Sequence, residues 1–133
     1  MRDILELRVY YEDTDFSGRV YHTSYLRFLE RGRTEWLRAR GLEHRMLSNS
    51  ANIVFTVRGL EIEYLAPALM DDLLTIITML AGARGAVVEF NQRILRGDKV
   101  LTEARVRVVA LRGAKPVRPP KELFEPRSAS QAG

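Results

Sequence analysis

Cysteine is absent from the 133-residue chain, and histidine occurs only twice, at His22 and His44. The absence of thiols excludes disulfide frameworks, thiolate nucleophiles and zinc–thiolate sites. Two histidines this far apart, without cysteine, do not indicate a metal site. We therefore expect no metal, and we expect His44 to lie on the surface.

The chain also lacks a long hydrophobic run. Its longest candidate, residues 73–80, is far shorter than the roughly 20 apolar residues of a transmembrane helix, and it favours a buried strand. The first residues show no apolar segment followed by a small-residue cleavage site, so they do not predict a secretory leader. We expect a cytoplasmic protein with no membrane span.

Lysine is scarce, so most of the positive charge is carried by arginine, which can pair with phosphate or carboxylate. The 21 basic and 17 acidic residues leave a formal charge of +4, spread along the chain. This excess is compatible with a small polyanionic ligand, and we expect no nucleic-acid binding because the charge forms no patch. With 46% hydrophobic residues the chain can bury one core, which predicts a single domain.

Two periodic segments open the chain. Residues 4–11 alternate apolar and polar side chains and predict a half-buried strand whose inner face ends with Tyr11. Residues 21–40 predict one long amphipathic helix, because apolar side chains recur three, four and seven positions apart. These side chains are Tyr25, Leu26, Leu29, Trp36 and Leu37. Gly32 lies within this stripe, which indicates a close approach to a sheet, and Gly41 is placed to end the helix.

Four further strands follow the helix. In the first, at residues 53–64, the apolar phase shifts at Gly59 and predicts a bulge or bend. The others are residues 73–80, 86–96 and 100–111, with Gly82 and Gly85 marking one turn and a tight hairpin marking the next. The order predicts an α+β fold in which a curved antiparallel five-stranded sheet packs on one helix.

Prolines interrupt the sequence beyond residue 112. We therefore expect a single domain at 1–112 and a poorly ordered, Pro-rich tail at 113–133. One helix covers only one face of such a sheet, and the outer strands stay unpaired, so we expect the chain to assemble with copies of itself.

An acidic loop leads directly into the start of the predicted helix. Free backbone N–H groups and the positive end of the helix dipole can stabilise a developing oxyanion there. A carboxylate a few residues upstream, at Asp13 or Asp15, can then act on the bound carbonyl as nucleophile or as base for water. Acidic residues before a helix also serve as caps, and the pattern alone leaves both interpretations open.

A longer motif surrounds this loop. It consists of Tyr11-x-Asp13-Thr14-Asp15, Gly18, Val20-Tyr21-His22, Tyr25-Leu26 and Glu30-x-x-Arg33-x-Glu35-Trp36. Later landmarks are Tyr64-Leu65-x-Pro67-Ala68, Asp71-Asp72-Leu73 and Phe90-x-Gln92. The pattern, which extends over about residues 4–125, resembles the 4-hydroxybenzoyl-CoA thioesterase superfamily, and within it the YbgC-like, Tol-Pal-associated acyl-CoA thioesterases.

The resemblance implies the hotdog fold, a helix wrapped by a curved antiparallel sheet, assembled as a homodimer or homotetramer. It implies hydrolysis of an acyl-CoA, or of an acyl carrier protein thioester, to a free acid and the thiol, without metal or cofactor. Asp15 matches the catalytic carboxylate, as nucleophile or general base, and the backbone amide of His22 matches the group that polarises the thioester carbonyl. Gly18, Tyr21 and Tyr25 are the expected substrate-binding residues, which shape the loop or line the acyl pocket.

Other interpretations stay open. The His22 imidazole either takes part in proton transfer or only caps and packs while its amide acts. Glu30 and Glu35 either form surface ion pairs or supply a helix carboxylate, as in some hotdog thioesterases of similar fold. The rival functions are a hotdog dehydratase acting on 3-hydroxyacyl thioesters and a non-catalytic module that binds acyl-CoA or a protein partner. The candidate arginines for coenzyme A phosphates are Arg58, Arg84, Arg93, Arg96 and Arg118.

Overall fold

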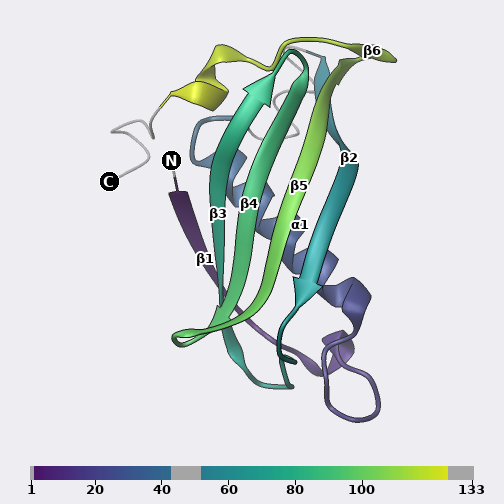
Figure 1. Cartoon of the computed structure of the whole chain (residues 1–133), viewed down its shortest axis with the longest axis vertical. Helices are drawn as coiled ribbons and strands as arrows, with labels where there is room; N and C mark the ends of the chain where they lie inside the picture. Colours follow the sequence, from purple (N-terminus) through teal and green to yellow (C-terminus); the bar gives the residue numbers. More distant parts are fainter. Residues whose placement is uncertain (1, 43–51, 126–133) are drawn as a thin grey trace.

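The computed structural model describes residues 2–42 and 52–125 (Figure 1). One α-helix, α1 (His22–Arg38), packs across a single antiparallel sheet. The strands are β1 (Arg2–Arg8), β2 (Ile53–Tyr64), β3 (Leu73–Arg84), β4 (Val87–Arg96), β5 (Lys99–Arg112) and the short β6 (Lys115–Pro116). Short 3₁₀ helices are η1 (Tyr11–Asp13) and η3 (Lys121–Phe124). The five long strands lie in the order β1-β3-β4-β5-β2, which confirms the expected α+β hotdog arrangement.

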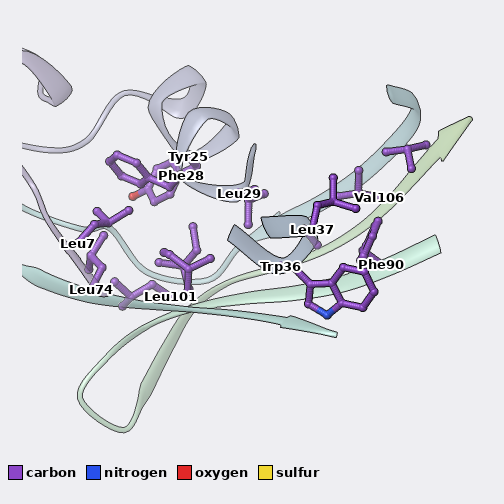
Figure 2. Packing of buried hydrophobic residues seen from close by; sticks show 14 of the residues in the cluster. Leu7, Tyr25, Phe28, Leu29, Trp36, Leu37, Leu74, Phe90, Leu101 and Val106 are labelled. Carbon is purple, nitrogen blue, oxygen red and sulfur yellow. The ribbon is translucent and has the colours of Figure 1, made fainter. Parts of the chain in front are cut away.

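The inner face of α1 forms the core together with the sheet (Figure 2). The buried side chains include Tyr25, Phe28, Leu29, Trp36 and Leu37 of the helix and Leu74, Phe90, Leu101 and Val106 of the strands. A Cβ at Gly32 would lie 2.7 Å from Thr78 Oγ1, so the expected close approach of helix and sheet is confirmed. Leu26 belongs to the apolar stripe that the sequence predicts, but it is 37% exposed, and Phe28 takes a core position instead.

The register of the sheet explains its bends. β2 pairs with β5 and shifts register between Val57 and Gly59, which confirms the predicted bulge. β3 continues past its expected end, and its register with β4 shifts between Leu80 and Gly82. The prediction that Gly82 marks the turn is wrong, because Gly82 lies at this bulge within the strand. The turn comes at Gly85, whose φ is 60°.

The first strand ends earlier than its alternation predicts. β1 ends at Arg8, and Tyr11 begins η1 with 78% of its surface exposed, so the prediction of Tyr11 on the buried face is wrong. The Tyr10 N–H donates to Asp13 Oδ2 at 2.9 Å, and the Asp13 N–H donates to the Tyr10 carbonyl at 3.0 Å. These local hydrogen bonds close a 3₁₀ turn and interrupt the extended backbone.

Residues 113–125 differ from the expected tail. β6 pairs with β5, the Val117 N–H donates to the Ala110 carbonyl at 2.9 Å, and Leu123 of η3 is fully buried in the core. The paired strand ends at Pro116, but the apolar Leu123 anchors the segment that follows. Residues 126–133 and His44 lie outside the described residues. Within the described ranges, no helix is long and apolar enough to cross a membrane.

Candidate active site

The loop before α1 is a tight hairpin. Thr14 and Val20 form an antiparallel bridge, and the Asp15 N–H donates to the Arg19 carbonyl at 2.8 Å. The Gly18 N–H donates back to the Asp15 carbonyl at 3.0 Å and closes the turn. Gly18 has a φ of 84°, a conformation that favours glycine because it has no Cβ. The turn thereby places Asp15 at the base of the hairpin, opposite Arg19.

The hairpin is fastened to the loop that joins β2 and β3. The Val20 N–H donates to the Ala68 carbonyl, and the Met70 N–H donates to the Gly18 carbonyl, both at 3.0 Å. Ala68 is itself fully buried. These cross-links restrict the backbone between Asp15 and the helix start, so the loop forms a defined part of the site.

Asp13 ties the loop to its neighbours on both sides. Its buried carboxylate accepts the Tyr10 N–H at Oδ2 and the Arg27 guanidinium at Oδ1, the latter at 3.0 Å. Its backbone carbonyl accepts the Tyr21 N–H at 3.0 Å and the Ser24 hydroxyl at 3.1 Å. Asp13 therefore braces η1 against the start of α1, and both of its carboxylate oxygens are occupied.

Asp15, by contrast, keeps an accessible carboxylate. Its Oδ1 accepts the Ser17 N–H at 2.8 Å and the Ser17 hydroxyl at 2.5 Å. The Ser17 hydroxyl and then the Ser17 N–H hold the pKa of Asp15 below its ordinary value, and the N–H and charge of Arg19 add to this. Within the described residues no donor contacts Asp15 Oδ2. The carboxylate is thus ionised at neutral pH and keeps one oxygen free.

The first residue of α1 offers a backbone donor. The first N–H groups of a helix have no partner within the helix, and the helix dipole is positive at that end. The Tyr21 and Ser24 N–H groups are satisfied by the Asp13 and Tyr21 carbonyls. The His22 amide has no acceptor among residues 2–42 and 52–125. It is therefore available to an oxygen on which negative charge develops.

A cavity of about 370 Å³ joins Asp15 to the start of α1. Its lining residues are Asp15, Arg19, Val20, His22, Tyr25, Tyr64, Leu65, Ala66 and Pro67. The Tyr64 ring, at the end of β2, lies with its centroid 4.6 Å from that of the His22 ring and 5.2 Å from that of the Tyr25 ring. Tyr25 is buried, its hydroxyl accepts the Ala68 N–H at 2.9 Å, and burial raises the pKa of Tyr25. Tyr25 therefore forms a fixed wall of the cavity.

The predicted site residues divide into two groups. Asp15, His22 and Tyr25 line this cavity together. Gly18 shapes the turn without lining the cavity, and Tyr21, which is 47% exposed, precedes the helix and is not among the lining residues. No role was predicted for Tyr64 from the sequence, although Tyr64 belongs to the later part of the motif. The register of a distant strand brings Tyr64 to the site, and no spacing near Asp15 signals it.

The two glutamates of α1 do not line the Asp15 cavity. Glu35 forms an ion pair with Arg38 at 3.3 Å on the surface. Glu30 lines a second cavity, of about 390 Å³, together with Arg33 and side chains of β2. Burial lowers the pKa of Arg33, whose guanidinium donates to Gln92 at 3.0 Å. In the part of the chain that the structure describes, no three His, Cys, Asp or Glu side chains are grouped to hold a metal ion.

The sequence matches the family model of the thioesterase-like superfamily over residues 9–126. The chain belongs to this superfamily. It is 44% identical to the acyl-CoA thioesterase YbgC of Haemophilus influenzae over 119 residues, which cover 88% of each chain. It is 45% identical to the acyl-CoA thioester hydrolase YbgC of Escherichia coli O6:H1 over 106 residues, which cover 79% of this chain and 78% of that one.

A solved structure agrees with the fold. The crystal structure of a probable thioesterase from Bartonella henselae matches with a TM-score of 0.87 at 40% identity, covering 90% of this chain and 100% of that chain. The superfamily and fold expected from the motif are thereby confirmed. The Asp15 hairpin lies inside the matched range.

Proposed function

We propose that this protein hydrolyses acyl-CoA thioesters to a free carboxylic acid and coenzyme A, with Asp15 as the reactive carboxylate and the His22 amide as the oxyanion donor. The observation that carries this proposal is that both residues line one cavity at the start of α1. The names of the Haemophilus influenzae and Escherichia coli relatives support acyl-CoA as the substrate class.

In this proposal the carbonyl oxygen of the thioester accepts the His22 N–H, and the helix dipole stabilises the negative charge that develops on that oxygen. Asp15 then acts in one of two ways. As nucleophile it attacks the carbonyl carbon, expels the thiolate and forms an acyl anhydride that water hydrolyses. As general base it takes a proton from a water molecule, which attacks the same carbon directly and expels the thiolate to leave the free acid.

The environment of Asp15 bears on this choice. Hydrogen bonds from Ser17 lower the pKa of Asp15, which keeps the carboxylate ionised but makes it a weaker base. The nucleophilic route needs an anionic oxygen free to approach the carbonyl carbon, and Oδ2 has no partner within the described residues. A lowered pKa also makes the carboxylate a weaker nucleophile, and a free oxygen serves general-base catalysis equally well, so the proposal keeps both routes.

Two further cavity residues have roles in the proposal. The His22 imidazole can protonate the departing thiolate, and the Arg19 guanidinium can pair with a coenzyme A phosphate. Arg96, a candidate from the sequence, is instead bound to Asp72 at 2.7 Å.

We propose coenzyme A as the carrier of the acyl group, with an acyl carrier protein thioester as the alternative. The cytoplasmic location stays a prediction.

We further propose that the chain works as a homodimer, or as a tetramer of two dimers. β2 is terminal in the sheet order, and its residues Val54, Val57 and Leu60 are 42%, 48% and 37% exposed. An open sheet edge with exposed apolar side chains invites pairing with a second copy of the strand. The mass of the protein in solution, measured by light scattering, tests this assembly, and a monomer at micromolar concentration contradicts it.

Release of free thiol from a panel of acyl-CoA esters tests the proposed activity. We expect catalytic release of coenzyme A from at least one saturated acyl-CoA. Hydration of an enoyl-CoA without thiol release would identify the dehydratase instead, and tight binding without turnover would identify the non-catalytic module. The dehydratase needs a helix carboxylate beside a histidine, whereas Glu30 and His22 line different cavities.

A further inference from the structure

Tyr64, the last residue of β2, contacts the start of α1 although it is 42 positions from His22 in the sequence. Pairing with Thr102 of β5 holds its backbone in the sheet. The Tyr64 ring lies tilted against the His22 ring, with 4.6 Å between the centroids and an interplanar angle of 37°. Its hydroxyl donates to the His22 carbonyl at 3.3 Å. Tyr64 therefore contacts His22 in two separate ways.

His22 has few other constraints. It occupies the first position of α1, its side chain is exposed, and neither ring nitrogen has a hydrogen-bond partner among the described residues. Such a side chain can occupy several rotamers. The Tyr64 ring lies against the imidazole and blocks the rotamers that would pass through it, while neither ring nitrogen has a hydrogen-bond partner among the described residues. Tyr25, which Ala68 holds through a hydrogen bond, packs edge-on against Tyr64 in turn.

We infer that Tyr64 is a positioning residue, which holds the His22 imidazole in place for the thioester step. The inference rests on the proposed function, because it gives the imidazole the task of protonating the departing thiolate. The ring contact carries most of this role, since the hydroxyl contact of 3.3 Å is long and exposed to water. Phenylalanine at position 64 is therefore expected to preserve most of the effect, and leucine to lose it.

The NMR signals of the imidazole test the positioning without any turnover. The chain has only two histidines, so the His22→Ala variant assigns the His22 signals directly. The ring current of an aromatic ring this close to the imidazole displaces the proton resonances of the imidazole. We expect this displacement in the unsubstituted protein and in Tyr64→Phe, and its loss in Tyr64→Leu. Signals that do not change in Tyr64→Leu overturn the inference, and this result does not depend on the role of Asp15.

Steady-state kinetics test the consequence. We expect Tyr64→Leu to lower kcat by at least about tenfold with KM changed less than about twofold, and Tyr64→Phe to stay within about threefold of the unsubstituted protein. His22→Ala keeps the backbone amide and removes the ring, so in this background Tyr64→Leu is expected to cost less than about twofold. An equal cost in both backgrounds, a raised KM at unchanged kcat, or an unchanged kcat in His22→Ala each overturns the inference.

Phe124→Leu is the matched control. Phe124 is a half-exposed aromatic side chain, 46% against 41% for Tyr64, and it lies on η3 at the opposite end of the molecule (Figure 1). We expect the Phe124→Leu variant to have the same kcat, KM and His22 NMR signals as the unsubstituted protein. If thermal unfolding shows that Tyr64→Leu does not fold, Tyr64→Ile takes its place, because a β-branched side chain suits a strand.

Discussion

The middle of α1 and its start use their polar groups in opposite ways. In the middle, Gly32 packs directly on the sheet, and the buried Gln92 side chain donates to the Leu29 carbonyl and the Thr78 hydroxyl at 2.9 Å each. At the start, the His22 amide and ring nitrogens have no partner among the described residues. The middle therefore uses its hydrogen-bonding groups to join helix and sheet, and the start leaves the His22 amide and ring nitrogens available to a ligand.

This difference predicts that stability and turnover respond to different substitutions. Changes in the middle of α1 lower the free energy of unfolding, because they disturb a close-packed contact. Changes at the start lower turnover and leave stability nearly intact, because the groups there are accessible to solvent. Asp13, which braces the loop against the helix, lies between these two extremes.

The largest expected effect on stability is that of Gly32→Val. A Cβ at this position would lie 2.7 Å from Thr78 Oγ1 and 2.8 Å from Ile76 Cγ2, and valine adds two methyl groups beyond it. Overpacking of this kind costs about 3 kcal/mol of unfolding free energy. Urea unfolding measures the loss. The matched control is Gly82→Val on β3, where a Cβ meets nothing within 4 Å. Equal free energies of unfolding for Gly32→Val and Gly82→Val would contradict a close contact between helix and sheet at Gly32.

Asp13→Asn is expected to affect both properties. Asparagine keeps the shape of the side chain but removes the charge that pairs with Arg27 at 3.0 Å, and it puts a donor where an acceptor is needed. We expect a loss of about 1 kcal/mol in unfolding free energy and a fall of several-fold in kcat as the hairpin loosens. Urea unfolding and thiol release on the same preparation check this. If the variant is destabilised but its kcat is unchanged, the contacts of Asp13 stabilise the fold without supporting catalysis, which would contradict this prediction.

Ser17→Ala is expected to have the smallest effect on stability and a specific effect on pH dependence. The Ser17 hydroxyl is the main cause of the lowered pKa of Asp15, so its removal raises that pKa toward the ordinary value. The carboxylate then becomes protonated at higher pH. The acidic limb of kcat/KM, measured against pH, is therefore expected to move to higher pH. A limb that stays in place would show that Asp15 does not control it.

The sequence predicts those parts of the fold that bury one regular face. The strand at residues 100–111 alternates buried and exposed side chains as its periodicity predicts, and most of the predicted apolar stripe of the helix is buried. The end of the first strand is predicted wrongly, because the Asp13 side chain binds the Tyr10 N–H and turns the backbone before Tyr11. The order of the C-terminal segment is also missed, because it depends on the burial of Leu123 against residues far away in the sequence. Neither effect is visible in local composition.

The candidate site also has one part that the sequence predicts and one part that it does not. Asp15 and His22 belong to one continuous motif, so the sequence predicts them as a pair, although their chemical roles stay predictions. Tyr64 reaches His22 only because β2 pairs with β5 in a register that sets it opposite Thr102. A register between strands far apart in the sequence depends on the whole sheet, and this is why Tyr64 had no predicted role.

Asp15→Asn tests most directly that the accessible carboxylate at the start of α1 carries out the chemistry. Its control is Asp98→Asn, an exposed aspartate in the turn between β4 and β5. We expect Asp15→Asn to lower kcat for thiol release by at least about a hundredfold, equivalent to about 2.7 kcal/mol in the activation barrier, while its melting temperature matches that of the control. A folded Asp15→Asn variant that keeps full thioesterase activity would contradict the proposed role of this residue.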